Sequence, residues 1–145
     1  MNAERVFTLE EVNALVPELS RIVEAQLLIQ SEIEGLLAEL ARTRTPLPIA
    51  MREEPSDPAE VLALKRRLCE RISKYNRGWE PIRRLGGVVK DPRVGMIDFY
   101  GNLDGRLVWL CWRFGERRVR YYHELDSDSV SPQLLRQQRA EAMLN

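Results

Sequence analysis

The chain has 145 residues, with 22 basic and 22 acidic side chains, one histidine, two cysteines and a formal net charge of zero. This length is enough for one domain with its own core, and 44% hydrophobic and 30% charged residues are typical of a globular protein. The charge is unevenly divided: residues 1–60 hold 12 acids and 5 bases, net −7, and residues 61–145 hold 10 acids and 17 bases, net +7. Because a nucleic-acid-binding domain usually carries a basic excess throughout, this division argues against that class.

The compartment can be predicted from the apolar runs and the cysteines. No apolar run approaches the length of a membrane span, so we expect no membrane partner. The first residues contain no basic region followed by an apolar stretch, and we therefore expect no signal peptide. Cys69 and Cys111 lie far apart without CxxC spacing, which indicates buried thiols rather than a disulfide or a zinc site. We expect a cytoplasmic protein.

A long first helix is predicted after residue 7. Thr8 and Glu11 have the spacing of a capping box, and Phe7 can pack on Val12 as a hydrophobic staple. Apolar residues then recur at alternating spacings of 3 and 4 as far as Leu40, with a polar break at Gln26. We expect Pro17 to bend or restart this helix, because proline lacks the amide that the helix interior needs.

A second helix is predicted after a proline-rich connection over residues 43–57. Asp57 and Pro58 are a typical helix start, and an apolar stripe runs from there to Ile82. Because neither helix can bury its stripe alone, we expect an antiparallel helical hairpin over residues 6–86, with Gln26 facing Tyr75.

The two predicted helices carry opposite charge. Residues 9–42 hold 7 acids and 2 bases, and residues 58–85 hold 3 acids and 8 bases. Such a hairpin is complementary to itself or, head to tail, to a second copy. We therefore expect a homo-oligomer that forms through the hairpin, as in a coiled coil.

The rest of the chain predicts strands and a short helix. Residues 88–125 have the pattern of an antiparallel meander of three to four strands, with residues 106–114 as the strongest strand. A Ser-Pro start predicts a C-terminal helix over residues 131–144. The expected fold is α+β, in a single domain of residues 1–145.

The register of the meander decides which polar residues meet. If residues 101–105 form a five-residue loop and Gly115-Glu116 a two-residue turn, Asp98 and His123 both lie opposite Val108 on one face. A slip of one residue in either loop would move them to opposite faces.

His123 and Cys111 are the candidate reactive side chains. His123 could be a general base oriented by Asp98, or a metal ligand together with Asp98 and Glu124. The alternative is a strand-end histidine that is hydrogen-bonded to a neighbouring carboxylate or carbonyl. Cys111 could be a nucleophile, but its place between two large apolar residues favours packing.

Charged residues near the turns are candidates for binding. Glu116 suits turn chemistry, an ion pair with Arg106 or Arg118, or a binding role. The arginines and aromatic residues of 109–122 resemble a platform for single-stranded nucleic acid, but the acidic helix can neutralise the arginines, so we expect no nucleic-acid partner. The candidate binding residues are Asp98, Arg106, Cys111, Glu116, His123 and Glu124.

Short motifs of this segment resemble a bacterial family known as domain of unknown function 2203. They are Val89-Lys90-Asp91, Ile97-Asp98-Phe99, Asp104-Gly105-Arg106, Leu110-Cys111-Trp112 and Tyr122-His123-Glu124, preceded by Phe7-Thr8-Leu9-Glu10-Glu11-Val12. The resemblance covers residues 6 to about 126 and implies kinship without an activity.

Two functions are compatible with these residues. The first is a non-enzymatic oligomeric scaffold or regulatory binding module, which dimerises through the hairpin and presents the sheet for recognition. The alternative is a small metal-dependent or acid–base enzyme using Asp98, His123 and Glu124. No cofactor is predicted, and a divalent metal belongs only to the alternative.

Overall fold

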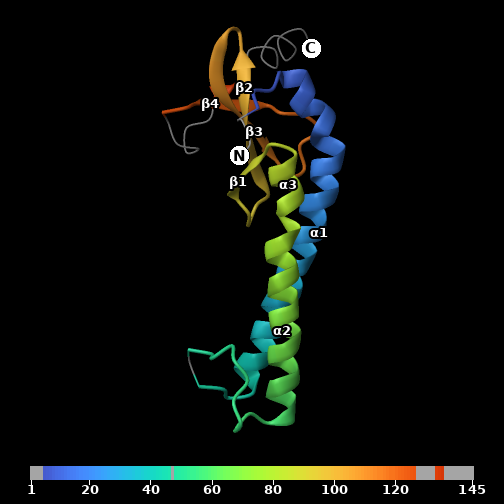
Figure 1. The fold of residues 1–145 in the computed structure, drawn as a ribbon, viewed down its shortest axis with the longest axis vertical. Coiled ribbons are helices and arrows are strands. Elements are labelled where there is room, and N and C mark those ends of the chain that lie inside the picture. Colours follow the sequence, from blue (N-terminus) through green and yellow to red (C-terminus); the bar gives the residue numbers. More distant parts are fainter. Residues whose placement is uncertain (1–4, 47, 127–132, 136–145) are drawn as a thin grey trace. The chain divides into compact units, whose positions relative to one another are not determined.

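The computed structural model describes residues 5–46, 48–126 and 133–135. The helices are α1 (Leu9–Arg42), α2 (Ala59–Gly78) and α3 (Glu80–Arg84), and the strands are β1 (Val88–Asp91), β2 (Met96–Leu103), β3 (Arg106–Arg113), β4 (Tyr121–Glu124) and β5 (Gln133–Leu134) (Figure 1). The expected α+β class is confirmed. Two compact units are present, one made of residues up to Glu24 and from Pro81 onward, the other of Ala25–Glu80. We call them the sheet unit and the hairpin unit. Within the described ranges, no helix combines the length and the apolar character needed to cross a membrane.

Helix α1 begins with the predicted capping box. The Glu11 amide donates to Thr8 Oγ1 at 3.1 Å, and the Thr8 amide donates to Glu11 Oε1 at 2.8 Å. Phe7 is 1% exposed, and its ring meets that of Phe99 edge to face, with the centroids 5.1 Å apart. The helix continues through Pro17 without interruption, so the expected restart is wrong. The buried apolar stripe on both sides of Pro17 outweighs the one hydrogen bond that proline removes.

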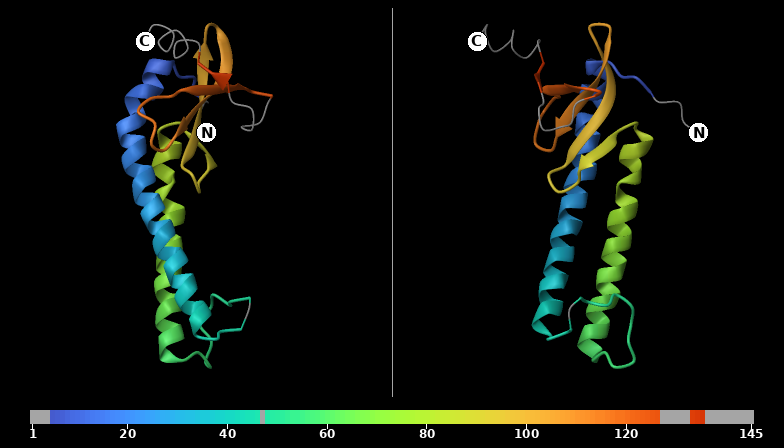
Figure 2. Two further views of the ribbon diagram at one scale, coloured as in Figure 1. Left: turned by 180° about the vertical axis from the view of Figure 1, so that it is seen from behind. Right: turned by 90° about the vertical axis from the view of Figure 1, so that its left-hand side faces the viewer.

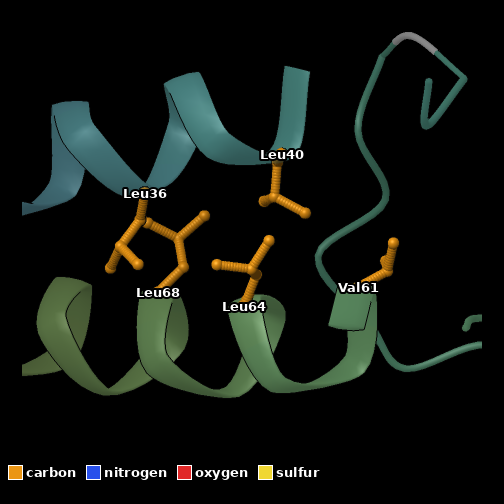
Figure 3. Close-up of a cluster of buried hydrophobic side chains, with 5 residues drawn as sticks. All are labelled: Leu36, Leu40, Val61, Leu64 and Leu68. Carbon is orange, nitrogen blue, oxygen red and sulfur yellow. The ribbon is translucent and has the colours of Figure 1, made fainter. Parts of the chain in front are cut away.

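In the hairpin unit, the second part of α1 lies beside α2 (Figure 2). A tight cluster of buried aliphatic side chains joins the two helices near their connection (Figure 3): Leu36, Leu40, Val61, Leu64 and Leu68. Burying each such side chain contributes about 1.5–3 kcal/mol. These are positions of the predicted stripes or their neighbours, so the 3.6-residue period indicated the packed faces correctly.

Polar contacts set the register of the two helices. Gln26 is 2% exposed, and its Nε2 donates to the backbone oxygen of Tyr75 at 2.7 Å. Further along, Arg71 Nε lies 3.0 Å from Glu32 Oε2. The partner of Gln26 is therefore the predicted residue, but the acceptor is its main-chain carbonyl, while the Tyr75 hydroxyl donates to Gln30 Oε1 at 3.5 Å.

A buried ion pair holds the connection between α1 and α2. The Lys65 side chain is 2% exposed, and its Nζ donates to Asp57 Oδ2 at 2.8 Å and to the Arg52 carbonyl at 3.0 Å. Asp57 Oδ2 also accepts the Glu54 amide at 2.8 Å. This pair satisfies a lysine on the apolar stripe of α2, a position where an unpaired charge would be costly.

The sheet unit contains one antiparallel sheet with strand order β1-β2-β3-β4-β5. Its core face is formed by large apolar side chains that are fully buried, among them Ile97, Phe99, Leu110 and Trp112. Because side chains alternate along a strand, the opposite face carries Asp98, Tyr100, Trp109, Cys111 and His123.

Both predicted loop lengths of the meander are wrong. β2 and β3 are joined by the two residues Asp104 and Gly105, whose φ angles of 52° and 82° suit a tight hairpin turn. The connection from β3 to β4 spans residues 114–120 and is therefore longer than a two-residue turn. Within it, Val119 is fully buried and its amide donates to Asn13 Oδ1 of α1 at 2.7 Å. The connection thus contacts α1 before the chain enters β4.

The strand count and the C-terminal helix also need correction. The sheet has five strands rather than three to four, because Gln133–Leu134 pairs with β4. These two residues fall inside the predicted helix of residues 131–144, so the helix prediction is wrong there. An open sheet edge offers main-chain hydrogen bonds that outweigh a local Ser-Pro start signal. The remainder of that predicted helix lies outside the described residues.

Candidate functional site

The only histidine of the chain is hydrogen-bonded to a buried aspartate. His123 Nε2 and Asp98 Oδ2 are 2.8 Å apart, with the side chains 1% and 0% exposed. Strand β3 lies between them: Asp98 of β2 opposes Cys111, and His123 of β4 opposes Trp109. The predicted common neighbour is wrong, because Val108 opposes Gly101 and Glu124.

The surroundings of the pair are largely aromatic. The rings of Trp109 and Tyr100 are stacked with centroids 4.0 Å apart, and the Trp109 ring lies 6.3 Å from that of His123. Lys90 Nζ lies over the Trp109 ring at 5.0 Å. In the described part of the chain, Asp98 Oδ1 is buried and accepts no hydrogen bond. The hydrogen bond between Nε2 and Oδ2 is therefore buried beside partly exposed aromatic rings.

Of the two cysteines expected to be buried, Cys69 is exposed, so that expectation is wrong for Cys69. Cys111 is buried and belongs to the same cluster as the His123–Asp98 pair. Its side chain is 2% exposed and lies next to Asp98 across the strand pair. Burial, followed by the negative charge of Asp98, raises the pKa of the Cys111 thiol to about 12. The thiol is thus protonated at neutral pH, whereas nucleophilic cysteines need the thiolate.

The remaining predicted residues do not join this cluster. Glu124 follows His123 on the strand and points to the other face, where its Oε1 accepts from Arg106 Nη1 at 2.8 Å. Glu116 lies at the end of β3, where its Oε1 accepts the Arg113 amide at 2.8 Å and its carbonyl accepts from Trp112 Nε1 at 3.0 Å. Among the described residues, no three His, Cys, Asp or Glu side chains are grouped as metal ligands.

A groove in the sheet unit contains one predicted site residue, Glu116. Its volume is about 430 Å³, and one wall is the first half of α1 while the other is the start of the β3–β4 connection. We call it the α1 groove, lined by Val16, Pro17, Ser20, Glu24, Phe114, Gly115, Glu116 and Arg117. Sequence reasoning did not find the groove, because its walls are about 100 residues apart and neither carries a motif.

Fold and site together define an α+β protein with a helical hairpin and a five-stranded antiparallel sheet, in which a histidine–aspartate pair is buried on the face opposite the core. Residues 5–130 match the family described as Uncharacterized conserved protein (DUF2203), and the chain belongs to this family. The family expected from the motifs is thereby confirmed. No match was found among curated proteins or among solved structures.

Proposed function

We propose that this protein is a non-enzymatic binding module that self-associates through the outward surface of its hairpin unit. The observation that carries this proposal is the exposed face of α1, where Leu28 is 63% exposed. Helical spacing places Leu28, Ser31, Gly35 and Ala38 on one stripe, and all four are exposed. Small residues on such a stripe permit a second helix to approach closely.

Charge complementarity favours a second copy of this chain as the occupant. Glu34 and Glu39 flank the stripe, and α2 exposes Arg67, Lys74 and Arg77. No ion pair joins these five residues to a partner in the part of the chain that the structure describes. When α1 of one copy lies against α2 of another, the acidic and basic side chains face each other. Such pairs select the partner and its orientation more than they stabilise.

The buried polar cluster supports a structural role over a catalytic one. His123 and Asp98 are covered, Cys111 holds its proton, and Glu124 is paired with Arg106. A general base has to come within hydrogen-bond distance of a substrate proton. In this proposal the pair stabilises the sheet.

Sedimentation equilibrium over a wide range of protein concentration tests self-association. We expect a monomer–oligomer equilibrium for the natural chain, and a shift to monomer for Leu28→Glu. Leu107→Glu is the matched control, because Leu107 is a 45% exposed leucine on β3. A chain that stays monomeric at all concentrations, or an equal effect of the two substitutions, would overturn the proposal.

An acid–base enzyme is the second candidate, and the unpartnered Oδ1 of Asp98 next to His123 favours it. Because the chain has one histidine, acylation by diethyl pyrocarbonate reports directly on access to His123. A structural pair predicts slow acylation of the native protein and fast acylation after denaturation. Fast acylation of the native protein would favour the enzyme.

A further inference from the structure

We infer that the α1 groove binds a basic peptide segment of a partner protein, with a lysine or arginine side chain in the groove. This inference deepens the proposed function, since it rests on the chain being a binding module and names the ligand class. A volume of about 430 Å³ suits one or two side chains of an extended segment. The inference depends on the rigidity of the groove walls and on their chemistry.

Hydrogen bonds hold the walls of the groove in place without a ligand. The Phe114 amide donates to the Gly95 carbonyl at 3.0 Å, and the Glu116 amide donates to the Arg113 carbonyl at 3.0 Å. Val119 ties the same connection to Asn13 of α1. A ligand therefore meets a formed groove, and little chain entropy is lost on binding.

The apolar part of the groove suits the stem of a long side chain. Val16 and Pro17 lie on α1, and Phe114, at 38% exposure, faces them from the other wall. Lysine and arginine place their methylene stems along apolar surface and keep the charged head near water or a carboxylate. The Phe114 ring adds an attraction for the cation itself.

Two carboxylates complete the site for the charged head. Glu24 is exposed and takes part in no ion pair among the described residues. Glu116 is half-buried, and burial raises the pKa of its carboxyl group despite the hydrogen bond from the Arg113 amide and the positive charges of Arg113 and Arg120. A bound cation offsets this cost of burial, because it favours the ionised carboxylate.

The guanidinium of Arg117 makes a peptide a better occupant than a free amine. Arg117 is exposed at the rim, and no ion pair involves it in the described part of the chain. Its N–H groups, with the Ser20 hydroxyl, can donate to main-chain carbonyls beside the bound side chain. Among the residues that line the groove, the two acidic side chains Glu24 and Glu116 stand against the one basic side chain Arg117. Because the charges of Arg113 and Arg120 already act on Glu116, the carboxylate that remains for the incoming cation is that of Glu24.

The probe for this site is N-acetyl-arginine methylamide, titrated into the 15N-labelled protein and followed by the amide signals of Ser20 and Gly115. We expect saturable shifts at both, with weaker binding of the uncharged N-acetyl-norleucine methylamide. Glu24→Gln should weaken binding by about two- to fivefold, as expected for one exposed ion pair. Glu39→Gln, an exposed glutamate of α1 in the hairpin unit, should leave binding unchanged.

Three results would overturn the inference. They are the absence of saturable shifts at the groove, equal binding of the arginine and norleucine probes, and stronger binding of N-acetyl-glutamate methylamide, which would make Arg117 the centre of an anion site. The titration is repeated on Leu28→Glu, which tests self-association separately. Retained groove binding in a monomer separates the two proposals, because self-association can then fail without the groove.

Discussion

Gly78, the last residue of α2, lies directly against the Gln26 side chain of α1. A Cβ atom at this position would overlap the side-chain amide of Gln26, so Gln26 would have to move and lose its hydrogen bond to Tyr75. Gly→Ala in a helix ordinarily stabilises by up to about 1 kcal/mol, whereas a buried polar group without a partner costs about 1–3 kcal/mol.

We therefore expect Gly78→Ala to lower the free energy of unfolding by about 1 kcal/mol in urea denaturation. The sign should reverse in a Gln26→Ala background, where the space is free. Gly35→Ala in the Leu28→Glu background, where self-association is expected to be lost, is the control, because no atom of the same chain lies within 4 Å of the place that its Cβ atom would take, and it should stabilise. Stabilisation by Gly78→Ala in the natural background would contradict the close contact.

The His123–Asp98 pair is the other contact at the residue scale that can be tested by substitution. His123→Phe removes the hydrogen bond between His123 and a buried carboxyl group, which keeps only the Cys111 thiol beside it, and we expect a cost of about 1–3 kcal/mol. The double variant with Asp98→Leu removes both polar groups, and replacing both partners by apolar groups can be nearly neutral. We expect the double variant to be more stable than His123→Phe alone, measured by urea denaturation in a double-mutant cycle. Additive losses in the cycle would show that the two side chains are not coupled.

At the scale of elements, the connection over residues 43–58 depends on the Asp57–Lys65 pair. The hydrogen bond from Lys65, followed by that from the Glu54 amide, holds the pKa of Asp57 below its ordinary value of 3.8. A carboxyl group whose pKa is lowered on folding contributes stability above its unfolded pKa and loses it as the pH falls through the folded pKa.

We expect the connection to loosen as the pH falls below 3.8, which can be followed by hydrogen exchange of the Glu54 amide. Asp57→Asn should be less stable than the natural chain at neutral pH, and the two should converge in acid. Other carboxylates with lowered pKa values, such as Glu11 and Glu53, titrate in both proteins, so the difference isolates Asp57. A difference that does not change with pH would exclude this role for the pair.

Local rules predicted the helices well and the strand register poorly. The capping box at Thr8 and the start after Asp57 depend on residues a few positions apart, and both helices begin within one or two residues of them. The register depends on where the chain goes between strands. Because the turn at Asp104-Gly105 has two residues, the observed pairing of β2 with β3 differs from the predicted pairing by three residues. Because the connection that contains Val119 is longer, the observed pairing of β3 with β4 differs from the predicted pairing by one residue.

The prediction that Asp98 and His123 lie on one face is correct although both registers are wrong, because both registers differ from the prediction by an odd number of residues. Each odd shift moves a residue to the opposite face of the sheet relative to β3, and two such moves restore a common face. The predicted row at Val108 was wrong, yet the two side chains are hydrogen-bonded on the other face. The α1 groove could not be predicted in this way, since its two walls meet only through the path of the β3–β4 connection.

At the scale of the whole molecule, the zero net charge is a sum of two opposite halves. In the hairpin unit, the acidic residues of α1 and the basic residues of α2 are only partly matched within one chain, as by Arg71 and Glu32. The exposed remainder, Glu34 and Glu39 on α1 and Arg67, Lys74 and Arg77 on α2, is available to a second copy. Attraction between such exposed groups is screened by salt over about 10 Å at 0.1 M.

If self-association depends on these charges, raising NaCl from about 0.05 M to about 0.5 M should increase the dissociation constant severalfold, because screening weakens exposed ion pairs. Sedimentation equilibrium at the two salt concentrations measures this change. The variant Glu34→Gln with Glu39→Gln should show weaker association at low salt and a smaller salt effect, since it lacks two of the partners. Association that strengthens with salt in the natural chain would instead indicate an interface dominated by the apolar stripe around Leu28, with no part for charge matching between the helices.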